Sequence, residues 1–327
     1  MKKEQTAQKR VSDVLSNSSI TPLIAIIVMV IALCFTTDTF LTPSNLGNVL
    51  RSFSMYCIMA VCMTMVIIVA GIDLSVGSTL AVTSIVAALI IQSGADPMLA
   101  ILGALLAGLI IGLVNGYLIA YVHLPAFVVT LGTQSALRGI ALVVTDGWPI
   151  NLTEQINKSW FRLIGRGELF GVLSMQAVIM IVVVLIGAFM LKKTKFGHHL
   201  YAVGGSERAA QLAGINERRI KLMAYTILGV LCAVVGIMYL SYVGAAQPTQ
   251  GQNYETNVIA AAVIGGAAMS GGEGTMMGTL LGAMTIGILL NGLTLLGVSA
   301  NYQKIAIGAV IVISVIISEK MKATRRK

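Results

Sequence analysis

Four ionisable side chains in or beside the apolar runs of this 327-residue chain could bind or carry an ion. Asp73, Glu255 and Glu273 lie near the ends of apolar runs, where water or free helix-end N–H groups can satisfy a carboxylate. Arg138 lies inside an apolar run. An ion-coupled carrier places such groups at the centre of the bilayer. A single arginine is a poor cation site, and an ion pair or a snorkelling side chain accounts for it as well.

No arrangement of residues predicts an enzyme. The histidines His123, His198 and His199 fall at the edges of apolar runs, without a Ser-His-Asp set or metal-ligand spacing. The chain has no Walker A sequence, so ATP hydrolysis would need a partner chain. The four cysteines lie inside apolar runs and are typical of small buried hydrophobes. We therefore predict a non-catalytic protein with no cofactor and no metal.

Neutral polar side chains recur within the apolar runs instead. Amides and hydroxyls suit a neutral, polyhydroxylated solute that binds weakly as it passes. Hydrogen bonds between helices explain the same residues about as well. The candidates for a translocation path are Asn115, Thr130, Gln134 and Asn291.

The composition indicates which elements must position these residues. Hydrophobic residues make up 57% of the chain and charged residues 11%, whereas about a quarter of a soluble domain is charged. The apolar runs are continuous, which favours helices of about 20 residues over barrel strands. We predict an all-α polytopic membrane protein with about ten transmembrane helices. The predicted spans are Ile20–Phe35, Met55–Ala70, Val76–Ile91, Met98–Tyr121, Ala126–Val144, Met175–Leu191, Leu222–Val243, Val258–Met269, Met276–Leu296 and Ile305–Ile317.

Most of the positive charge lies in three segments, residues 1–19, 192–221 and 319–327. The positive-inside rule places all three in the cytoplasm. Ten spans between residues 20 and 318 put both termini and the 192–221 loop on that same side, whereas an odd count would not. The net charge of +9 thus sets orientation. No basic patch with interleaved aromatic residues remains to predict nucleic-acid binding.

The polar segment 192–221 carries its own helix signals. Ser206 is an N-cap residue, Glu207 falls in the first turn, where the helix dipole favours negative charge, and Gly214 can end the helix in the left-handed conformation. These signals predict a short helix over Glu207–Ala213, outside the bilayer. The segment is either an ordinary positively charged loop or a docking element for a soluble partner, and its residues alone favour neither.

Two longer connections are predicted to face outward. Residues 145–174 contain aromatic side chains that fit the membrane interface or a short surface helix. Residues 245–257 are polar without being basic, as a contact for an external partner would be.

Glycine spacing carries two further signals. Gly108, Gly112 and Gly116 share one helix face, and so do Gly278 and Gly282, which predicts close helix packing. The sequence 71–73 (GID) also resembles 271–273 (GGE), each followed by Thr-Leu, at an offset of 200 residues. This similarity is either a trace of an internal repeat or chance in a glycine-rich chain.

Several long motifs occur in one order along the chain: GIDLSVGS at 71–78, LPAFVVTLGT at 124–133, YAVGGSERAAQLAGI at 201–215, AAQPTQGQNYE at 245–255, IAAAVIGGAAMSGGEGTMMGTLLGA at 259–283 and NGLTLLGVSANYQ at 291–303. On these motifs the chain resembles the membrane permease subunit of bacterial monosaccharide ABC importers, the ribose type above all, over essentially its whole length.

The resemblance implies a permease fold at residues 20–318 and a place in the bacterial cytoplasmic membrane. It also implies a cytoplasmic ABC ATPase docked on the 192–221 loop, an extracytoplasmic sugar-binding protein, a second copy of the chain, and lipid around them. The ATPase-coupling residues would be Gly204, Gly205, Ser206, Glu207, Ala209, Ala210 and Gly214. The predicted contacts of the binding protein are Gln247, Tyr254 and Glu255.

The chain departs from the family pattern at three places. Ser206 replaces the usual Asn, although both are competent N-caps. Thr256-Asn257 replaces Leu-Asp, and Ala300-Asn301 replaces Ser-Tyr. The sequence thus predicts the import of ribose or a related sugar and leaves the exact sugar open. The alternative is an ion-coupled secondary transporter of a small polar solute.

Overall fold

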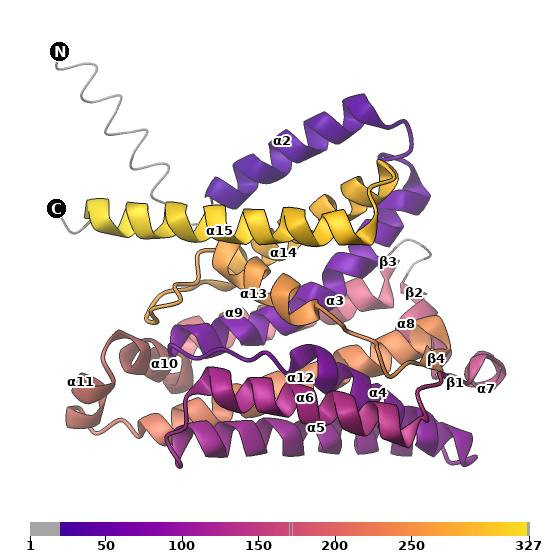
Figure 1. Ribbon diagram of the computed structural model, residues 1–327, viewed down its shortest axis with the longest axis horizontal. Coiled ribbons are helices and arrows are strands. Elements are labelled where there is room, and N and C mark those ends of the chain that lie inside the picture. Colours follow the sequence, from indigo (N-terminus) through magenta and orange to yellow (C-terminus); the bar gives the residue numbers. More distant parts are fainter. Residues whose placement is uncertain (1–19, 170, 172, 326–327) are drawn as a thin grey trace.

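Each apolar run predicted as a span forms a helix in the computed structural model, which describes residues 20–169, 171 and 173–325 (Figure 1). The predicted N-terminal segment 1–19 and the last two residues of the basic tail lie outside the described residues. Six helices of the described chain are long and apolar enough to cross a membrane. They are α3 (Pro43–Ile68), α5 (Pro97–Ala120), α6 (Ala126–Val144), α9 (Met175–Lys193), α12 (Glu217–Val243) and α14 (Met276–Leu295).

Four other apolar helices have shorter apolar lengths of 10–17 residues. They are α2 (Ile20–Thr36), α4 (Val76–Gln92), α13 (Tyr254–Ile264) and α15 (Ala300–Arg325). Length and composition therefore agree with an all-α polytopic membrane protein, with six helices that meet the full criterion in the described residues. Caps set several starts, because the side chains of Thr42 and Asp96 accept from backbone N–H groups and a proline follows each.

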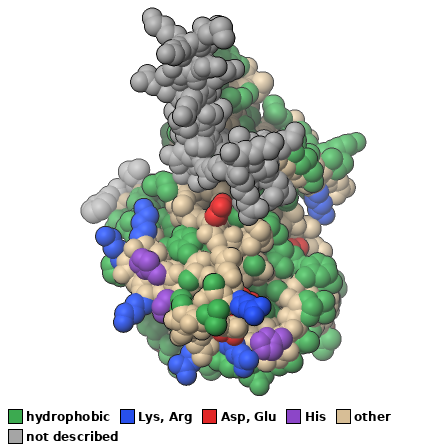
Figure 2. All heavy atoms as spheres, turned by 90° about the vertical axis from the view of Figure 1, so that its left-hand side faces the viewer, with side chains coloured by type: hydrophobic (Ala, Val, Ile, Leu, Met, Phe, Trp, Pro, Cys, Tyr) green, Lys and Arg blue, Asp and Glu red, His purple; other side chains and the backbone are tan. Residues whose placement is uncertain are grey.

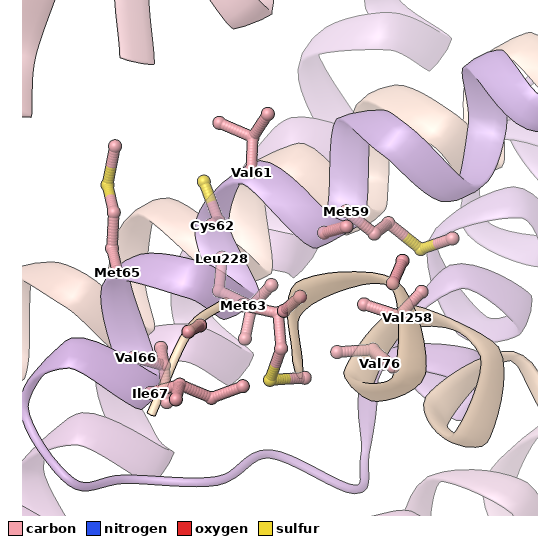
Figure 3. Packing of buried hydrophobic residues seen from close by; sticks show 14 of the residues in the cluster. Met59, Val61, Cys62, Met63, Met65, Val66, Ile67, Val76, Leu228 and Val258 are labelled. Carbon is pink, nitrogen blue, oxygen red and sulfur yellow. The ribbon is translucent and has the colours of Figure 1, made fainter. Parts of the chain in front are cut away.

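Helix α3 runs through the centre of the bundle. No residue from Cys57 to Ile68 is more than 1% exposed, as expected of a helix that is apolar on every side. Its side chains pack against Val76 of α4, Leu228 of α12 and Val258 of α13 (Figure 3). The core thus joins α3 to the first turn of α4 and the first half of α13.

Helices α5 and α12 touch through their backbones, as the glycine spacing predicts. A Cβ on Gly112 would lie 2.6 Å from the Tyr225 carbonyl oxygen, and one on Gly116 would lie 3.0 Å from the Leu222 carbonyl oxygen. Gly108 and Gly229 likewise face one another. The prediction of close packing is confirmed for this face, and also for Gly278 and Gly282, which lie against α13.

Helix α4 begins inside the bundle, against the connection that leads into α13. Residues 76–79 at the start of α4 are buried, and Gly77 meets the backbone of Gly251, just before α13. Most of the connection 244–253 is consequently buried instead of forming a free loop. The predicted end of the next span at Met269 is wrong. Helix α13 ends at Ile264, because the backbone turns at Gly265 and at Gly266, whose φ is +88°.

One end of the bundle carries the predicted docking segment. Helices α10 (Lys195–Gly205) and α11 (Glu207–Leu212) lie there with the end of α9 and the start of α12. We call this the basic end, after Lys192, Lys193, Lys195, Arg208, Arg218, Arg219 and Lys221. Figure 2 looks onto it and shows Lys, Arg and His side chains spread over the face.

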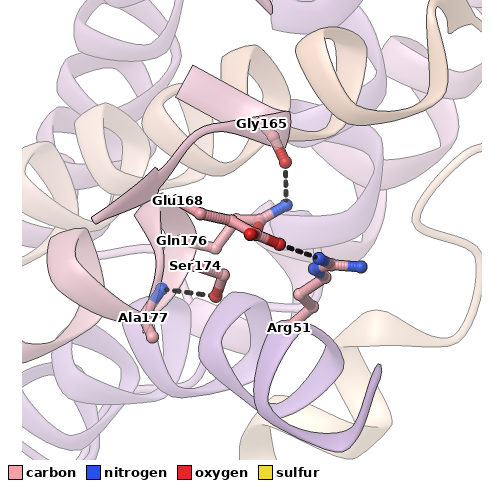
Figure 4. Close-up of polar contacts among 6 residues, drawn as sticks. All are labelled: Arg51, Gly165, Glu168, Ser174, Gln176 and Ala177. Atoms are coloured by element: carbon pink, nitrogen blue, oxygen red, sulfur yellow. Dashed lines mark hydrogen bonds and ion pairs between the residues drawn. The ribbon is translucent and has the colours of Figure 1, made fainter. Parts of the chain in front are cut away.

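The opposite end is closed by the short helices α7 (Thr153–Lys158) and α8 (Arg162–Arg166) and four two-residue strands. Strand β1 (Ile150–Asn151) pairs antiparallel with β4 (Ala245–Ala246), and β2 (Glu168–Leu169) with β3 (Leu173–Ser174). Arg51 of α3 forms an ion pair with Glu168 at 3.2 Å, and Gln176 donates to the Gly165 carbonyl (Figure 4). The connection 145–174 thus does form short surface helices.

Candidate functional site

The predicted short helix is present as α11, ending one residue earlier than expected. The Ser206 hydroxyl accepts from the Ala209 backbone N–H at 3.2 Å, and Glu207 lies in the first turn. Gly214 has a φ of +80°, which is the left-handed conformation expected at a helix end. The local signals in the sequence are therefore confirmed.

The sequence reasoning missed α10, which precedes α11 directly. The Thr194 hydroxyl accepts from the Gly197 N–H at 3.2 Å and starts this helix. Leu200 and Val203 of α10 are buried while its other face is open. A Thr followed by apolar residues at helical spacing was the available signal, although the basic residues around it suggested a loop.

The seven candidate coupling residues differ in exposure. Ala210 is buried and Gly204 and Glu207 are half-buried, whereas Gly205, Ser206, Ala209 and Gly214 are exposed. Leu212 was not among the candidates, yet its side chain is 85% exposed at the end of α11. The Leu212 side chain is therefore accessible to a partner at the end of α11.

An ion pair joins α11 to α12. Lys221 donates to Glu207 at 2.7 Å, with 19% of the lysine side chain and 43% of the glutamate side chain exposed. Both residues line a cavity of about 310 Å³ at the basic end. Tyr225, His123 and Gly71 also line it, so the cavity lies between α11 and the interior of the bundle.

The two similar glycine-acid sequences, 200 residues apart, meet beside α10. We call residues 69–75 the first turn and residues 265–275 the second turn. The Gly272 N–H donates to the Ile68 carbonyl at 2.8 Å, and a Cβ on Gly271 would lie 3.1 Å from the Ala70 side chain. Their similarity thus corresponds to neighbouring positions in the fold.

A tyrosine holds a carbonyl of each turn. Tyr201 of α10 donates to the Gly274 carbonyl at 2.6 Å, and Tyr225 of α12 donates to the Ile72 carbonyl at 3.1 Å. Burial raises the pKa of the Tyr201 phenol. The Tyr201 hydroxyl therefore remains protonated at neutral pH and can donate this bond.

Asp73 in the first turn lies at the centre of a polar network. It accepts from the Ser75 N–H at 2.7 Å, from the Ser75 hydroxyl at 2.6 Å and from the Asn115 amide at 3.4 Å. The Asn115 carbonyl oxygen in turn accepts from Thr133 at 2.6 Å. The network joins the start of α4 to α5 and α6. The amide nitrogen and the carbonyl oxygen of Asn115 both bond to groups of this chain.

Of the other three path candidates, Thr130 and Gln134 lie one turn apart on α6, whereas Asn291 lies on α14. Thr130 donates to the Ala126 carbonyl within α6 at 2.8 Å. Asn291 of α14 and Asn45 of α3 exchange two amide hydrogen bonds, at 2.8 and 3.0 Å. Gln134 is half-buried on α6 and hydrogen-bonds the Glu255 carboxylate. All four candidates thus bond to groups of their own chain, which agrees with a role in holding helices together.

Arg138 holds the buried connection before α13. It donates to the carbonyls of Pro248 and, at 2.9 Å, Gln250, and it interacts electrostatically with Glu255. A guanidinium with these partners cannot act as a cation site. Glu273, in the second turn, is exposed at the basic end.

The predicted binding-protein contacts lie around the start of α13. The Tyr254 ring packs on Tyr56 with centroids 4.7 Å apart, and Glu255 reaches the first turn of α4 at Gly77. Gln247 and Glu255 are half-buried. Their role toward a partner stays a prediction. Among the described residues, no group of three or more His, Cys, Asp or Glu side chains could hold a metal ion.

Comparisons with known proteins show which proteins this chain is similar to. A family model described as "Branched-chain amino acid transport system / permease component" matches residues 45–315. The chain is 41% identical to the ribose import permease protein RbsC of Bacillus subtilis (strain 168) over 98% of each chain. It is 42% identical to RbsC of Escherichia coli (strain K12) over 91% of this chain and 92% of that one.

A less similar relative is named for a different sugar. The chain is 33% identical to the L-arabinose ABC transporter permease protein AraH of Azospirillum brasilense, over 92% of this chain and 87% of that one. No solved structure matches the chain.

Proposed function

The chain belongs to the branched-chain amino acid transport system / permease component family, and from its similarity to ribose import permeases we propose that it imports a monosaccharide. It is the permease subunit of a sugar ABC importer and a multi-pass protein of the cytoplasmic membrane. The observation that carries this function is the identity of 41–42% to two ribose import permeases over more than nine-tenths of each chain.

The proposed energy source is an ABC ATPase bound at the basic end. The chain has no Walker A sequence, and α11 offers a capped, exposed helix with Leu212 at its tip. On this proposal the basic end faces the cytoplasm, both termini lie on that side, and all ten apolar helices belong to the membrane domain. Gly204, Gly205, Ser206, Glu207, Ala209, Ala210 and Gly214 form the region that responds to the ATPase.

The sugar enters from the opposite end on this proposal. A sugar-binding protein docks there, near β1, β4 and the start of α13, and delivers substrate toward Gln247, Tyr254 and Glu255. Two copies of the chain enclose the path. Helix α6 supplies a suitable wall, because Gly132, Ser135 and Gly139 are exposed on it and no atom of the described residues outside the adjoining turns of α6 lies within 4 Å of a Cβ built on either glycine.

Ribose is the first substrate to test, because both ribose permeases match at higher identity than the arabinose permease does. Gln134 lies on another face of α6 than Gly132, Ser135 and Gly139, and it bonds to Glu255. Asn115, Thr130 and Asn291 contribute mainly through the helix contacts described above.

The test is sugar uptake with and without the ATPase. We expect labelled ribose to enter proteoliposomes that contain the permease, its ATPase, internal ATP and external loaded binding protein. Uptake should stop when the ATPase or ATP is omitted and should persist with an uncoupler. Uptake that needs no ATPase and collapses with an uncoupler would instead establish the ion-coupled alternative. Competition by unlabelled arabinose or xylose identifies the preferred sugar.

A further inference from the structure

Gly204 occupies the place where the docking region meets both turns. We propose that Gly204 is a positioning residue that passes movement of α10 and α11 to the helices that begin at the first turn and the second turn. The proposal rests on the ATPase-driven function above. It adds the contact through which movement caused by the ATPase reaches the helix bundle.

The contact at Gly204 is between backbones. A Cβ at this position would overlap the Ile68 carbonyl oxygen and would lie 2.6 Å from the Gly272 backbone nitrogen. Neither atom belongs to a side chain that could swing away. A Cβ on the neighbouring Gly205 would meet nothing within 4 Å. The close approach is therefore specific to one of the two adjacent glycines and not a general property of this helix end.

Hydrogen bonds fasten the parts that meet there. The Gly272 N–H donates to the Ile68 carbonyl at 2.8 Å, which ties the second turn to the end of α3. Tyr201, one helical turn before Gly204, donates to the Gly274 carbonyl at 2.6 Å. The end of α10, the end of α3 and the second turn consequently form a single bonded unit.

The outer helix is held far more loosely. Within α11 only Ala210 is buried, and the link to α12 is the half-exposed pair of Glu207 and Lys221 beside the 310 Å³ cavity. A soft contact next to a void absorbs movement, whereas a close-packed backbone contact transmits it. Movement of the docking region therefore reaches the bundle through α10 rather than α11, and Gly204 is where α10 meets the end of α3 and the second turn.

The two turns lead to helices that start or end inside the bundle. The first turn continues into the buried start of α4, where Asp73 bonds Ser75 and Asn115. The second turn joins α13 to α14. Displacing the bonded unit thus shifts α4, α13 and α14 together. Such a shift of packed helices between two discrete arrangements is a known form of switching transition.

The experiment compares two variants at this contact with two matched controls, in proteoliposomes that contain the ATPase and the loaded binding protein. Gly204→Ala adds the overlapping methyl group, and Tyr201→Phe removes only the hydroxyl that bonds Gly274. The controls are Gly47→Ala, where a Cβ meets nothing within 4 Å, and Tyr117→Phe, whose ring is exposed. The readouts are bound ATPase, ATP hydrolysis and sugar imported per ATP.

We expect both contact variants to keep the ATPase bound. Sugar imported per ATP should fall about three- to tenfold for Tyr201→Phe, as loss of one hydrogen bond in the link allows, and further for Gly204→Ala. Both controls should keep the wild-type ratio. If Gly204→Ala fails to insert, Tyr201→Phe decides. A wild-type ratio in the contact variants, or loss of ATPase binding in them, overturns the proposal. Wild-type protein that imports no sugar with ATP refutes the proposed function instead.

Discussion

At the scale of single residues, the pair formed by Glu207 and Lys221 makes the first prediction. Lys221 donates to Glu207 at 2.7 Å, and the pair is partly exposed, so it contributes only about 0.5–1 kcal/mol. Glu207→Arg places a second cation beside Lys221, and we expect uptake to fall by about threefold or more. The exchange of both charges, Glu207→Lys with Lys221→Glu, should restore most of it. Uptake of labelled sugar in cells measures each step.

The chain offers a control for this exchange at the opposite end. Glu154 and Lys158 of α7 form an exposed pair at 3.6 Å, away from the docking region. Since α7 follows β1, where the binding protein is proposed to dock, the readout for this control is the ATPase, and Glu154→Arg should leave ATPase binding at the wild-type level, whereas Glu207→Arg should weaken it. If the double exchange is no better than Glu207→Arg alone, the ion pair is not what holds α11 in its working position.

Sequence reasoning succeeds for residues whose partners are close along the chain. Ser206 and Gly214 could be predicted because a cap and a helix end depend on a few neighbouring residues. The Asp73–Asn115 and Asn45–Asn291 bonds join positions 42 and 246 residues apart. No spacing rule connects such positions, so Asn115 and Asn291 could be recognised as polar but not as partners of other side chains.

At the scale of elements, Leu212 at the end of α11 makes the second prediction. Its side chain is 85% exposed, and burying a leucine in an interface stabilises a complex by about 1.5–3 kcal/mol. Leu212→Ser should therefore weaken binding of the ATPase by about 10- to 100-fold. Titration of purified ATPase onto permease in detergent or nanodiscs measures the change in Kd.

A matched substitution separates this contact from general effects of polarity. Leu163 of α8 is 51% exposed at the opposite end, so Leu163→Ser should leave the Kd for the ATPase unchanged. Equal Kd values for both variants would mean that α11 does not present Leu212 to the ATPase.

The boundaries of elements show where a pattern of apolar residues stops being informative. The run after residue 258 continues as far as Met269, and it predicts a helix of that length. The chain instead leaves the helix at Gly265 and reaches a φ of +88° at Gly266, because the second turn must reach Ile68. A long-range contact of this kind overrides local propensity, and α10 was missed for a related reason, since its burial depends on α9, α12 and α3.

At the scale of the whole molecule, the order of the helices along the chain could be predicted from the apolar runs. Whether a helix begins at the surface or inside the bundle could not. Periodicity and length indicate a helix in each run, and each helix is present. Neither apolar length nor periodicity indicates that α4 begins within the bundle, where Gly77 meets Gly251. Only the two glycines hinted at a close approach of backbones.

Orientation in the membrane makes the third prediction, because the basic end should face the cytoplasm. Gln211→Cys on α11 and Gln155→Cys on α7 place one exposed thiol at each end of the bundle. The background carries Cys34→Ala, since Cys57, Cys62 and Cys232 are buried while Cys34 is exposed.

In intact spheroplasts a membrane-impermeant thiol reagent should label Gln155→Cys and spare Gln211→Cys, and inside-out vesicles should show the reverse. The reason is that Lys and Arg flanking a span are retained on the cytoplasmic side. Labelling of Gln211→Cys from outside would show that the protein has the opposite orientation. The proposed ATPase site would then face the outside, where no ATP is available.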